Sequence, residues 1–429
     1  MISSSKTYNF LLMVFIVCLG IIPSPYRINI FGLDMNIDRL IIMIALVVTF
    51  LIFLQGKNSI KNIQLVLFSY LIIVLLNNFL IGNIQLMSIY IALLLFFLSS
   101  NLLEEETFTK ALSLSFVGLA IWTSYSVIFF FYYGEALIEV PFANLLPSFM
   151  ETRLEHAEMI SASYSIFPRI SFPYASPPQL SAVAGLFFLF FFYQFQMRNT
   201  EYKSLSITYS LMGMIASIGI VIATISRTGL AVIAAGLFFY YLFSLNLRLK
   251  VSSLLTTFFY ALTLFGLSVL ILNYFSDNLI ANAITSRFTS SDDFSALNPR
   301  SHLTIRIEGI EYYFNMSFFE KLFGIGYLNY EVLHFHSSLL TALIEIGIFG
   351  FSLILLALCY PLKKAFQLLG SLERKKIEQG KFVISLIMAL IVAHLAYELP
   401  YIQFLWIFWG YAFCITLSEK KEPLRDKYA

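Results

Sequence analysis

The feature that most constrains this chain is a series of apolar segments, each roughly 20 residues long, that recurs along its whole length. Hydrophobic residues make up 59% of the 429 positions and charged residues only 12%, whereas about half apolar is typical of a soluble domain. A helix of roughly 20 apolar residues is long enough to cross the hydrocarbon core of a bilayer. The sequence therefore predicts an all-α integral membrane protein, a single polytopic unit over residues 1–429 with about 12 transmembrane helices.

The predicted spans alternate with polar connections of very different lengths. Two connections are long enough to be external loops with structure of their own, over residues 134–178 and 274–335. The spans are predicted near residues 9–25, 37–54, 63–81, 84–100, 111–133, 179–197, 204–225, 228–245, 252–273, 336–360, 381–398 and 401–418.

The distribution of lysine and arginine predicts how these spans are oriented. Most lysines lie on alternate short connections and near both termini, so the positive-inside rule places those connections and both termini in the cytoplasm. The opposite side carries Lys321 as its one lysine but is rich in arginine, at positions 27, 39, 153, 169, 227, 287, 300 and 306. Arginine matches a phosphate with two parallel hydrogen bonds, which indicates phosphate handling outside the cytoplasm. The alternative is that these side chains extend along the membrane interface and serve as anchors.

Three of these arginines are the best phosphate candidates from position alone. Arg227 lies in the shortest external turn, between two apolar spans, where a lone charge is costly unless it faces a wet cavity. An interfacial anchor is the alternative for Arg227, and Ser226 or Thr228 is expected to cap the helix that follows. Arg300 and Arg306 precede a stretch with helical spacing in the second long loop.

The histidines offer proton-accepting groups on the same side. His336 opens the tenth predicted span, close to His334, where a neutral imidazole could accept a proton from an attacking hydroxyl. A structural hydrogen bond at the interface is the alternative for His336. His394 and Glu398 are four residues apart and share one helix face near the external end. They either line the same cavity or form a structural pair.

The glycines nearby are predicted to serve structure rather than nucleotide binding. Gly324-Ile-Gly326 is too short for a nucleotide fingerprint and follows no predicted strand, so we predict a turn. Gly347 and Gly350 in the tenth span are expected to allow close helix packing.

No metal site or cofactor is predicted. The three cysteines all lie within apolar spans, which argues against a disulfide framework or a metal cluster. Asp34 and Asp38 in the first external loop are an alternative, because an acid in that loop could act as a base with a metal. Asp38 stands directly before a predicted helix, where a capping role is more common.

Several of these landmarks together resemble the O-antigen polymerase and O-antigen ligase superfamily. Arg169, followed by a proline-rich run, resembles the arginine motif that precedes the family's central spans. Ser226-Arg227-x-Gly229 resembles the family's short Ser-Arg-Gly turn.

Two further landmarks complete this resemblance, which covers roughly residues 165–355. Arg306, eighteen residues before Gly324, resembles the family's external-loop arginine and glycine pair. The stretch from His336 to Gly350 resembles its His-Asn-x-x-Leu…Gly-x-x-Gly signature, with Ser337 standing where the family has asparagine.

The resemblance implies a GT-C-like polytopic glycosyltransferase that needs neither nucleotide sugar nor metal. Members transfer glycans from an undecaprenyl pyrophosphate donor outside the cytoplasmic membrane. Carried onto this chain, His336, Arg227 and Arg306 would be catalytic. Donor and sugar binding would fall to a second set of residues: Arg169, Arg300, His334, His394 and Glu398.

The first hypothesis is therefore a polymerase of lipid-linked polysaccharide repeat units in a bacterial cytoplasmic membrane, with its active site on the external face. Its partners would be an undecaprenyl pyrophosphate-linked oligosaccharide, the bilayer, a chain-length regulator and a flippase, and no nucleic acid. An O-antigen ligase, which hands the glycan to lipid A-core, is the close alternative. A polysaccharide flippase or transporter is the alternative from another class, but intramembrane charges and repeat symmetry are then expected.

Overall fold

The computed structural model describes nine helices and one β-hairpin. The residues that it describes are 105–133, 170, 173, 174, 176–197, 205–244 except 225, 302–326, 337–396 and 403–417, together with shorter N-terminal pieces. The N-terminal pieces are 10, 13–18, 21, 27–30, 33–36, 40, 44, 66–73 and 75. The helices are α5 (Glu105–Tyr133), α7 (Pro177–Met197), α8 (Ile207–Ala223), α9 (Arg227–Ser244), α12 (His302–Asn315), α13 (Phe318–Phe323), α14 (Ser338–Leu369), α15 (Arg374–Ala396) and α16 (Gln403–Leu417).

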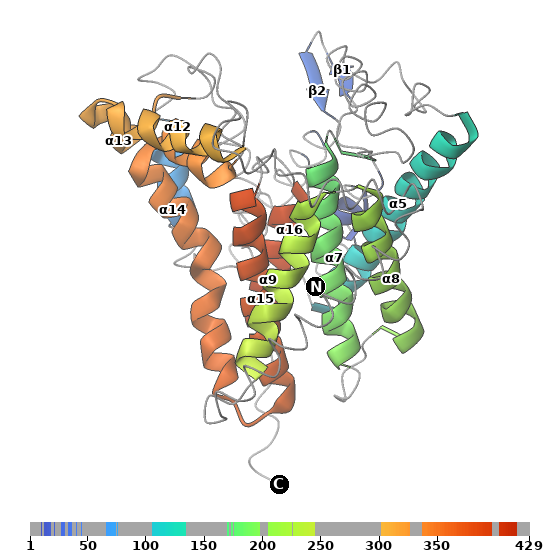
Figure 1. The fold of residues 1–429 in the computed structure, drawn as a ribbon. Helices are drawn as coiled ribbons and strands as arrows, with labels where there is room; N and C mark the ends of the chain where they lie inside the picture. Colours follow the sequence, from blue (N-terminus) through green and yellow to red (C-terminus); the bar gives the residue numbers. More distant parts are fainter. Residues whose placement is uncertain are drawn as a thin grey trace.

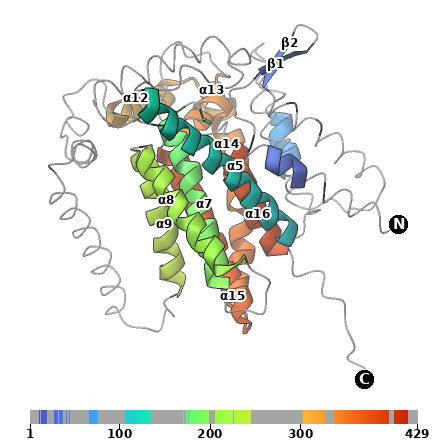
Figure 2. The same cartoon turned by 90° about the vertical axis from the view of Figure 1, so that its right-hand side faces the viewer.

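Seven of these helices form a bundle, and α12 and α13 lie across one end of it (Figures 1 and 2). Side-chain contacts give the relative directions of the helices. The ring of Phe116 on α5 contacts that of Phe187 on α7, and Tyr193 bonds to Glu105, so these two helices are antiparallel. The hydroxyl of Ser385 on α15 donates to the carbonyl of Gly236 on α9, 2.6 Å away, within a second antiparallel pair.

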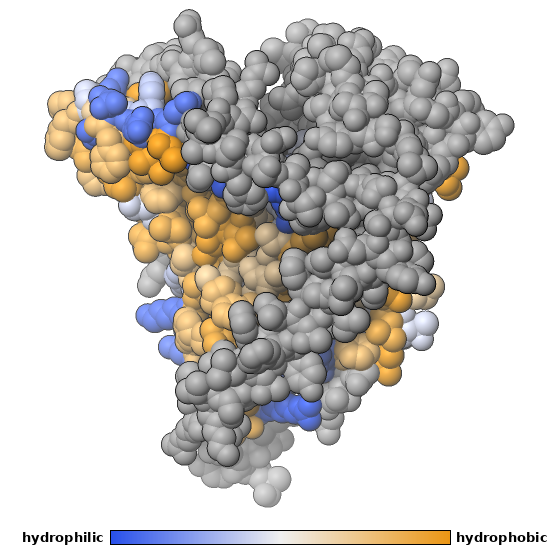
Figure 3. Space-filling model, in the orientation of Figure 1, coloured by the Kyte–Doolittle hydropathy of each residue, from blue (hydrophilic) through white to orange (hydrophobic). Residues whose placement is uncertain are grey.

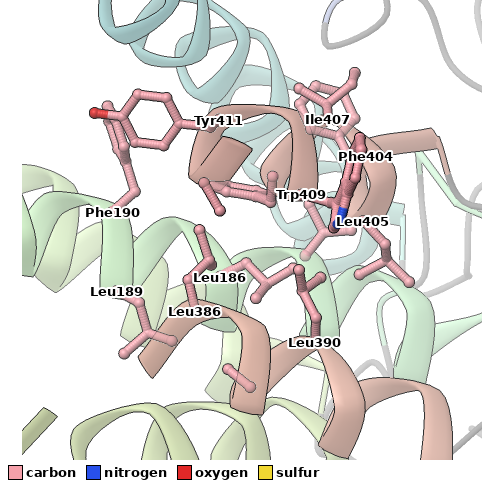
Figure 4. Packing of buried hydrophobic residues seen from close by; sticks show 14 of the residues in the cluster. Leu186, Leu189, Phe190, Leu386, Leu390, Phe404, Leu405, Ile407, Trp409 and Tyr411 are labelled. Carbon is pink, nitrogen blue, oxygen red and sulfur yellow. The ribbon is translucent and has the colours of Figure 1, made fainter. Parts of the chain in front are cut away.

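The central helix of the bundle is α7, most of whose side chains are buried. The ring of Phe187 contacts the rings of Phe116, Phe404 and Phe408, so one phenylalanine joins α5, α7 and α16. Leucines from α7 and α15 complete this packing against α16 (Figure 4). Aromatic side chains bury large areas, which explains how a helix with few polar groups becomes the core of the fold.

Small residues allow the backbones of α7 and α9 to approach closely. A side chain at Gly229 would overlap Ser181, and one at Gly236 would overlap Leu189. A Cβ at Gly185 would lie 3.0 Å from the carbonyl oxygen of Gly229. Close contact through small residues is how helices associate in a bilayer, where apolar burial alone gives little driving force.

Five of the described helices are long and apolar enough to cross a membrane: α5, α7, α9, α14 and α15. The apolar helices α8 and α16 are shorter. The outer face of α8 exposes Met212 and Ile215 in the middle of the helix, as expected of a surface that meets lipid. These features confirm the predicted α-helical membrane architecture for the part of the chain that the structure describes.

The helix boundaries differ from the predicted spans mainly at the α14–α15 connection. The tenth span was predicted to end near residue 360, but α14 continues through Pro361 to Leu369, and α15 begins at Arg374 instead of 381. The connection is therefore four residues long, and all of the lysines predicted for it lie on helices. The prediction placed Pro177 and Pro178 in the first long loop, but they form the first turn of α7, where proline is well tolerated.

Three predicted spans, near 37–54, 84–100 and 252–273, fall outside the described residues except for positions 40 and 44. The sequence did not predict the antiparallel hairpin of β1 (Arg27–Ile30) and β2 (Leu33–Asn36), in which Asn29 pairs with Asp34. Asp34 is therefore a strand residue, and Asp38 lies outside the described residues.

A buried polar network lies at the end of the bundle where α15 begins. Glu105 on α5 accepts hydrogen bonds from the hydroxyl of Tyr193, at 3.2 Å, and from the amide of Gln379, at 3.0 Å. Beside it, the hydroxyl of Tyr411 bonds to Thr109 and accepts from Gln194, both at 3.0 Å. Buried polar groups are costly unless paired, so this network requires α5, α7, α15 and α16 to meet in one arrangement.

Replacing Gln379 with leucine should lower the free energy of unfolding by about 1–3 kcal/mol, because one oxygen of the buried Glu105 carboxyl loses its donor. Gln367→Leu is the matched control, since Gln367 is exposed on α14 and should change stability little. Reversible unfolding in mixed micelles measures both. Equal effects of the two substitutions would show that the network contributes nothing to stability.

Candidate functional site

The turn that carries Arg227 is held against α7 by backbone contacts. Arg227 is the first residue of α9, and the hydroxyl of Ser226 accepts from the amide of Thr228, 3.4 Å away, which confirms the predicted cap. The hydroxyl of Ser181 on α7 accepts from the amide of Gly229 at 2.9 Å and donates to the carbonyl of Ser226 at 3.4 Å. The Ser-Arg-x-Gly sequence thus forms a turn. Its backbone lies so close to Ser181 of α7 that a side chain at Gly229 would overlap it.

A second segment joins the same corner. Ile170, the residue after Arg169, donates its amide to the carbonyl of Ala223 at the end of α8, 3.2 Å away. Ala223 lies four residues before Arg227. Arg169 itself lies outside the described residues, so its proposed role stays a prediction.

Arg306 reaches the bundle from α12. Its Nη2 donates to the carbonyl oxygen of Ala396, the last residue of α15, at 2.9 Å. The last carbonyls of a helix have no partner within the helix, so a guanidinium is a favourable donor there. Partial burial lowers the pKa of the Arg306 guanidinium, which nevertheless stays protonated in a protein. Arg306 therefore supplies a partly desolvated positive charge at the end of α15.

The register between α9 and α15 places Arg227 at the same end. Gly236 and Ser385 are bonded across this antiparallel pair. Arg227 is nine residues before Gly236, and His394 is nine residues after Ser385, so both lie roughly 14 Å along their helices from this bond. Packed helices have axes roughly 8–10 Å apart. Arg227, His394 and the end of α15 that binds Arg306 thus lie at one level of the bundle.

His394 is the most enclosed of the candidate residues. Its side chain is 2% exposed, and its ring lies 5.1 Å from that of Trp406 on α16. Within the described part of the chain, its Nε2 atom has no hydrogen-bond partner. His394 is therefore packed between α15 and α16, and an unfilled hydrogen-bonding position remains on its ring.

An unusual backbone crossing holds α12 and α13 against α14. Gly347 interrupts the helical conformation of α14 with a φ of 64°, and the carbonyls just before it bond to another segment. The carbonyl of Ile344 accepts from the amide of Ile325, and that of Glu345 accepts from the amide of Gly326, both at 3.1 Å. Gly324-Ile-Gly326 is thus a turn, as predicted, but it also pairs with the broken helix.

Glycine is required on both sides of this crossing. A Cβ on Gly324 would overlap the Glu345 carbonyl, and one on Gly347 would overlap the Leu322 carbonyl. The positive φ of Gly324, 84°, adds a second restriction. Gly347 thus allows the close approach of α13 to α14, as expected, but it does so by interrupting its own helix, which was not predicted.

The first turn of α14 is buried and polar. Ser337, Ser338 and Thr341 are all at most 5% exposed, and Ser337 precedes the helix as its N-cap. The residue before it, His336, lies outside the described residues. The same holds for His334, Arg300 and Glu398. Of the eight predicted site residues, the structure therefore describes Arg227, Arg306 and His394, and it places them at one end of the bundle.

Three groups at this end were not identified from the sequence. Ser181 and the Ala396 carbonyl carry no local signal, because a serine or a backbone oxygen is recognisable only once its partner is known. The pairing of Gly324 with Gly347 had a partial signal, since both glycines lie in predicted motifs. Among the described residues, no three His, Cys, Asp or Glu side chains gather closely enough to hold a metal ion.

Comparison with known proteins assigns no family, so the class of the protein is inferred from its fold. No protein-family model matches the chain, and no curated protein is detectably similar to it. The long apolar helices define an α-helical, multi-pass membrane protein.

Replacing Gly324 or Gly347 with alanine should lower the midpoint of thermal unfolding markedly, because each Cβ would overlap backbone atoms and each φ is positive. Their ψ angles are 173° and −179°, and this combination with a positive φ is essentially confined to glycine and costs another residue roughly 1–3 kcal/mol before any overlap is counted. Gly370→Ala is the matched control, since its Cβ would meet its nearest neighbour at 3.5 Å and its φ is −80°. A thermal-shift assay in detergent compares them. Midpoints for Gly324→Ala and Gly347→Ala as high as that of the control would contradict the crossing.

Proposed function

We propose that this chain is a polymerase of lipid-linked polysaccharide repeat units. It transfers a glycan from an undecaprenyl pyrophosphate donor to a sugar hydroxyl of a second, lipid-linked acceptor. The resemblance of the arginine, glycine and histidine motifs to the O-antigen polymerase and ligase superfamily supports this assignment.

The single observation that carries the proposal is the placement of two arginines, from distant parts of the chain, at one end of the bundle. Arg227 begins α9, and Arg306 comes from α12, yet the α9–α15 register and the Arg306–Ala396 bond bring them to one level. Two guanidinium groups can bind a diphosphate through paired hydrogen bonds. The N-terminus of α9 adds the partial positive charge of its unpaired amides at the same place.

Charge also differs between the two ends of the bundle. At the opposite end, the α14–α15 connection is surrounded by Lys363, Lys364, Arg374, Lys375, Lys376 and Lys381. Lysine-rich connections are retained in the cytoplasm. The proposal therefore places Arg227 and Arg306 on the external face of a bacterial cytoplasmic membrane and both termini in the cytoplasm. On the external face, a flippase would present the lipid-linked donor, and a chain-length regulator would act.

In the proposed reaction, the acceptor hydroxyl attacks the anomeric carbon of the donor glycan. The new glycosidic bond forms as the bond from that carbon to the pyrophosphate oxygen breaks, and undecaprenyl pyrophosphate leaves with the electron pair. His336 accepts the hydroxyl proton. The two guanidinium groups stabilise the negative charge that grows on the leaving group, a function that a divalent ion serves in other glycosyltransferases. A single displacement predicts inversion at the anomeric carbon.

The sequence alternatives make different products, so reconstitution separates them. Purified protein in proteoliposomes, supplied with a synthetic undecaprenyl pyrophosphate oligosaccharide, should yield a ladder of glycans that increase by one repeat unit. The ladder should persist in EDTA, because the proposed site uses no metal. Transfer only to added lipid A-core would instead indicate a ligase. Movement of substrate across the bilayer without new bonds would indicate a transporter, and a strict requirement for a divalent ion would redirect the site to the Asp34 and Asp38 loop.

Neutralising either arginine should reduce the rate of transfer by roughly 100-fold or more, because removal of one stabilising donor commonly has that effect. Arg306→Gln is compared with Arg306→Ala, since glutamine keeps a polar amide but carries no charge. Arg227→Gln should behave alike. Arg374→Gln, an exposed arginine at the start of α15, should retain full activity.

Thermal-shift midpoints accompany these rate measurements, so loss of charge can be distinguished from loss of folding. Wild-type transfer by Arg306→Gln together with loss in Arg306→Ala would show that transfer does not require the charge of Arg306. His336→Ala tests the proton acceptor in the same assay.

A further inference from the structure

The helices α12 and α13 form an arm, residues 302–323, whose first helix has one face turned toward the bundle. Gly309 and Met316 are buried and Tyr313 is partly buried, at positions that fall on one side of a helix of 3.6 residues per turn. Met316 packs in a small apolar cluster with Ile325 and Ile344 at the glycine crossing. This face attaches the arm to α14.

A second face of the arm is apolar but exposed. Ile307, Ile310 and Phe314 follow one another at helical spacing on α12, and Phe318 and Phe319 continue the series on α13. The exposed fractions of the three phenylalanines are 68%, 72% and 73%. Such a concentration of exposed aromatic side chains is unusual on a surface that meets only water.

The third face of α12 is polar. Glu308, Glu311 and Asn315 are exposed and lie next to the apolar face but away from α14. The helix is therefore divided into a sector for protein, a sector of apolar side chains and a sector for water. This pattern is typical of a helix that lies in the plane of a membrane surface.

The apolar face of the arm continues into the lipid-facing surface of the bundle. The ring of Phe323, the last residue of α13, lies 5.6 Å from that of Phe349 on α14. Ile348 and Phe349 are themselves exposed and belong to a helix that is long and apolar enough to span the membrane. In the space-filling view, hydrophilic residues lie along the top of the arm, and hydrophobic residues at its edge and beneath them continue toward those of the bundle (Figure 3).

We propose that the α12–α13 arm docks on the lipid bilayer, with Phe314, Phe318 and Phe319 at the boundary between headgroups and acyl chains. The arm lies crosswise at one end of the bundle (Figures 1 and 2), and Glu308 and Glu311 lie on its exposed polar sector, beside the apolar one. The proposal does not depend on the proposed function, because it rests on the geometry of the surface alone. A second copy of the chain covering this face, or water, are the other occupants that an experiment must separate.

Membrane docking of the arm would also set the depth of Arg306. Arg306 and Ile307 are adjacent on α12, and Arg306 is bonded to the end of α15. A guanidinium at this position would lie at the level of lipid phosphates, whereas the phenylalanines insert just below them. The arm thus gives a physical reason for a charged group at the edge of the apolar surface.

Spin labels show directly whether lipid, water or protein covers the apolar face of the arm. Phe314→Cys and Phe318→Cys, and Glu308→Cys and Asn315→Cys as matched controls, are made with Cys18, Cys359 and Cys414 replaced by alanine, and the labelled proteins are placed in lipid nanodiscs. Accessibility to oxygen should exceed accessibility to a water-soluble nickel chelate at the two phenylalanine positions, and the ratio should invert at the controls. Ratios at the phenylalanine positions equal to those of the controls would overturn the proposal. Low accessibility to both reagents would also overturn it, because another protein surface would then cover the face.

Tryptophan fluorescence gives a second measurement in the otherwise native sequence. Phe318→Trp should add emission that lipids brominated near the headgroup quench, over the background of Trp122, Trp406 and Trp409. Asn315→Trp should add emission that aqueous iodide quenches instead. Iodide quenching of both added signals to the same extent would contradict docking on the bilayer. Unchanged thermal-shift midpoints would show that each exposed substitution leaves the fold intact.

Discussion

The structure at the candidate site depends on the pairing of backbone groups that a broken helix leaves open. Inside a membrane every amide and carbonyl needs a partner from the protein, and an unpaired buried carbonyl costs about 1–3 kcal/mol. The break at Gly347 frees the carbonyls of Ile344 and Glu345, and the Gly324–Gly326 turn supplies amides to both. One irregularity in α14 therefore determines where α13 ends, where α12 lies and which part of the bundle Arg306 reaches.

The two ends of the bundle use polar groups in different ways. At the α15 start, Glu105 is enclosed by Tyr193 and Gln379, so its carboxyl is occupied by structural partners. At the other end, the turn of Arg227 is stabilised by Ser181 and by backbone bonds. Serine, glycine and backbone groups therefore maintain the turn of Arg227, whereas Arg306 itself joins α12 to the end of α15.

The sequence alone predicted the helical membrane class and most of the described helix positions, and it named Ser226 as one of two candidate caps, because apolar periodicity and capping are local properties. It could not predict that Arg306 bonds to the Ala396 carbonyl, since any helix end offers such an oxygen. Nor could it show that Gly347 interrupts a helix: a glycine in an apolar span reads equally as a packing residue. The α14–α15 boundary was misplaced because the lysines after residue 360 were assigned to a connection, although α14 continues through Pro361 to Leu369.

The short connection between α14 and α15 has a mechanical consequence. The two helices are joined at one end by four residues, and at the other end the arm joins them again, through the Gly324–Gly347 crossing and the Arg306–Ala396 bond. The helices α14 and α15 and the arm are therefore each connected to the other two. Any motion that separates the ends of α14 and α15 on the side of Arg306 must therefore break the Arg306–Ala396 bond or the Gly324–Gly347 crossing.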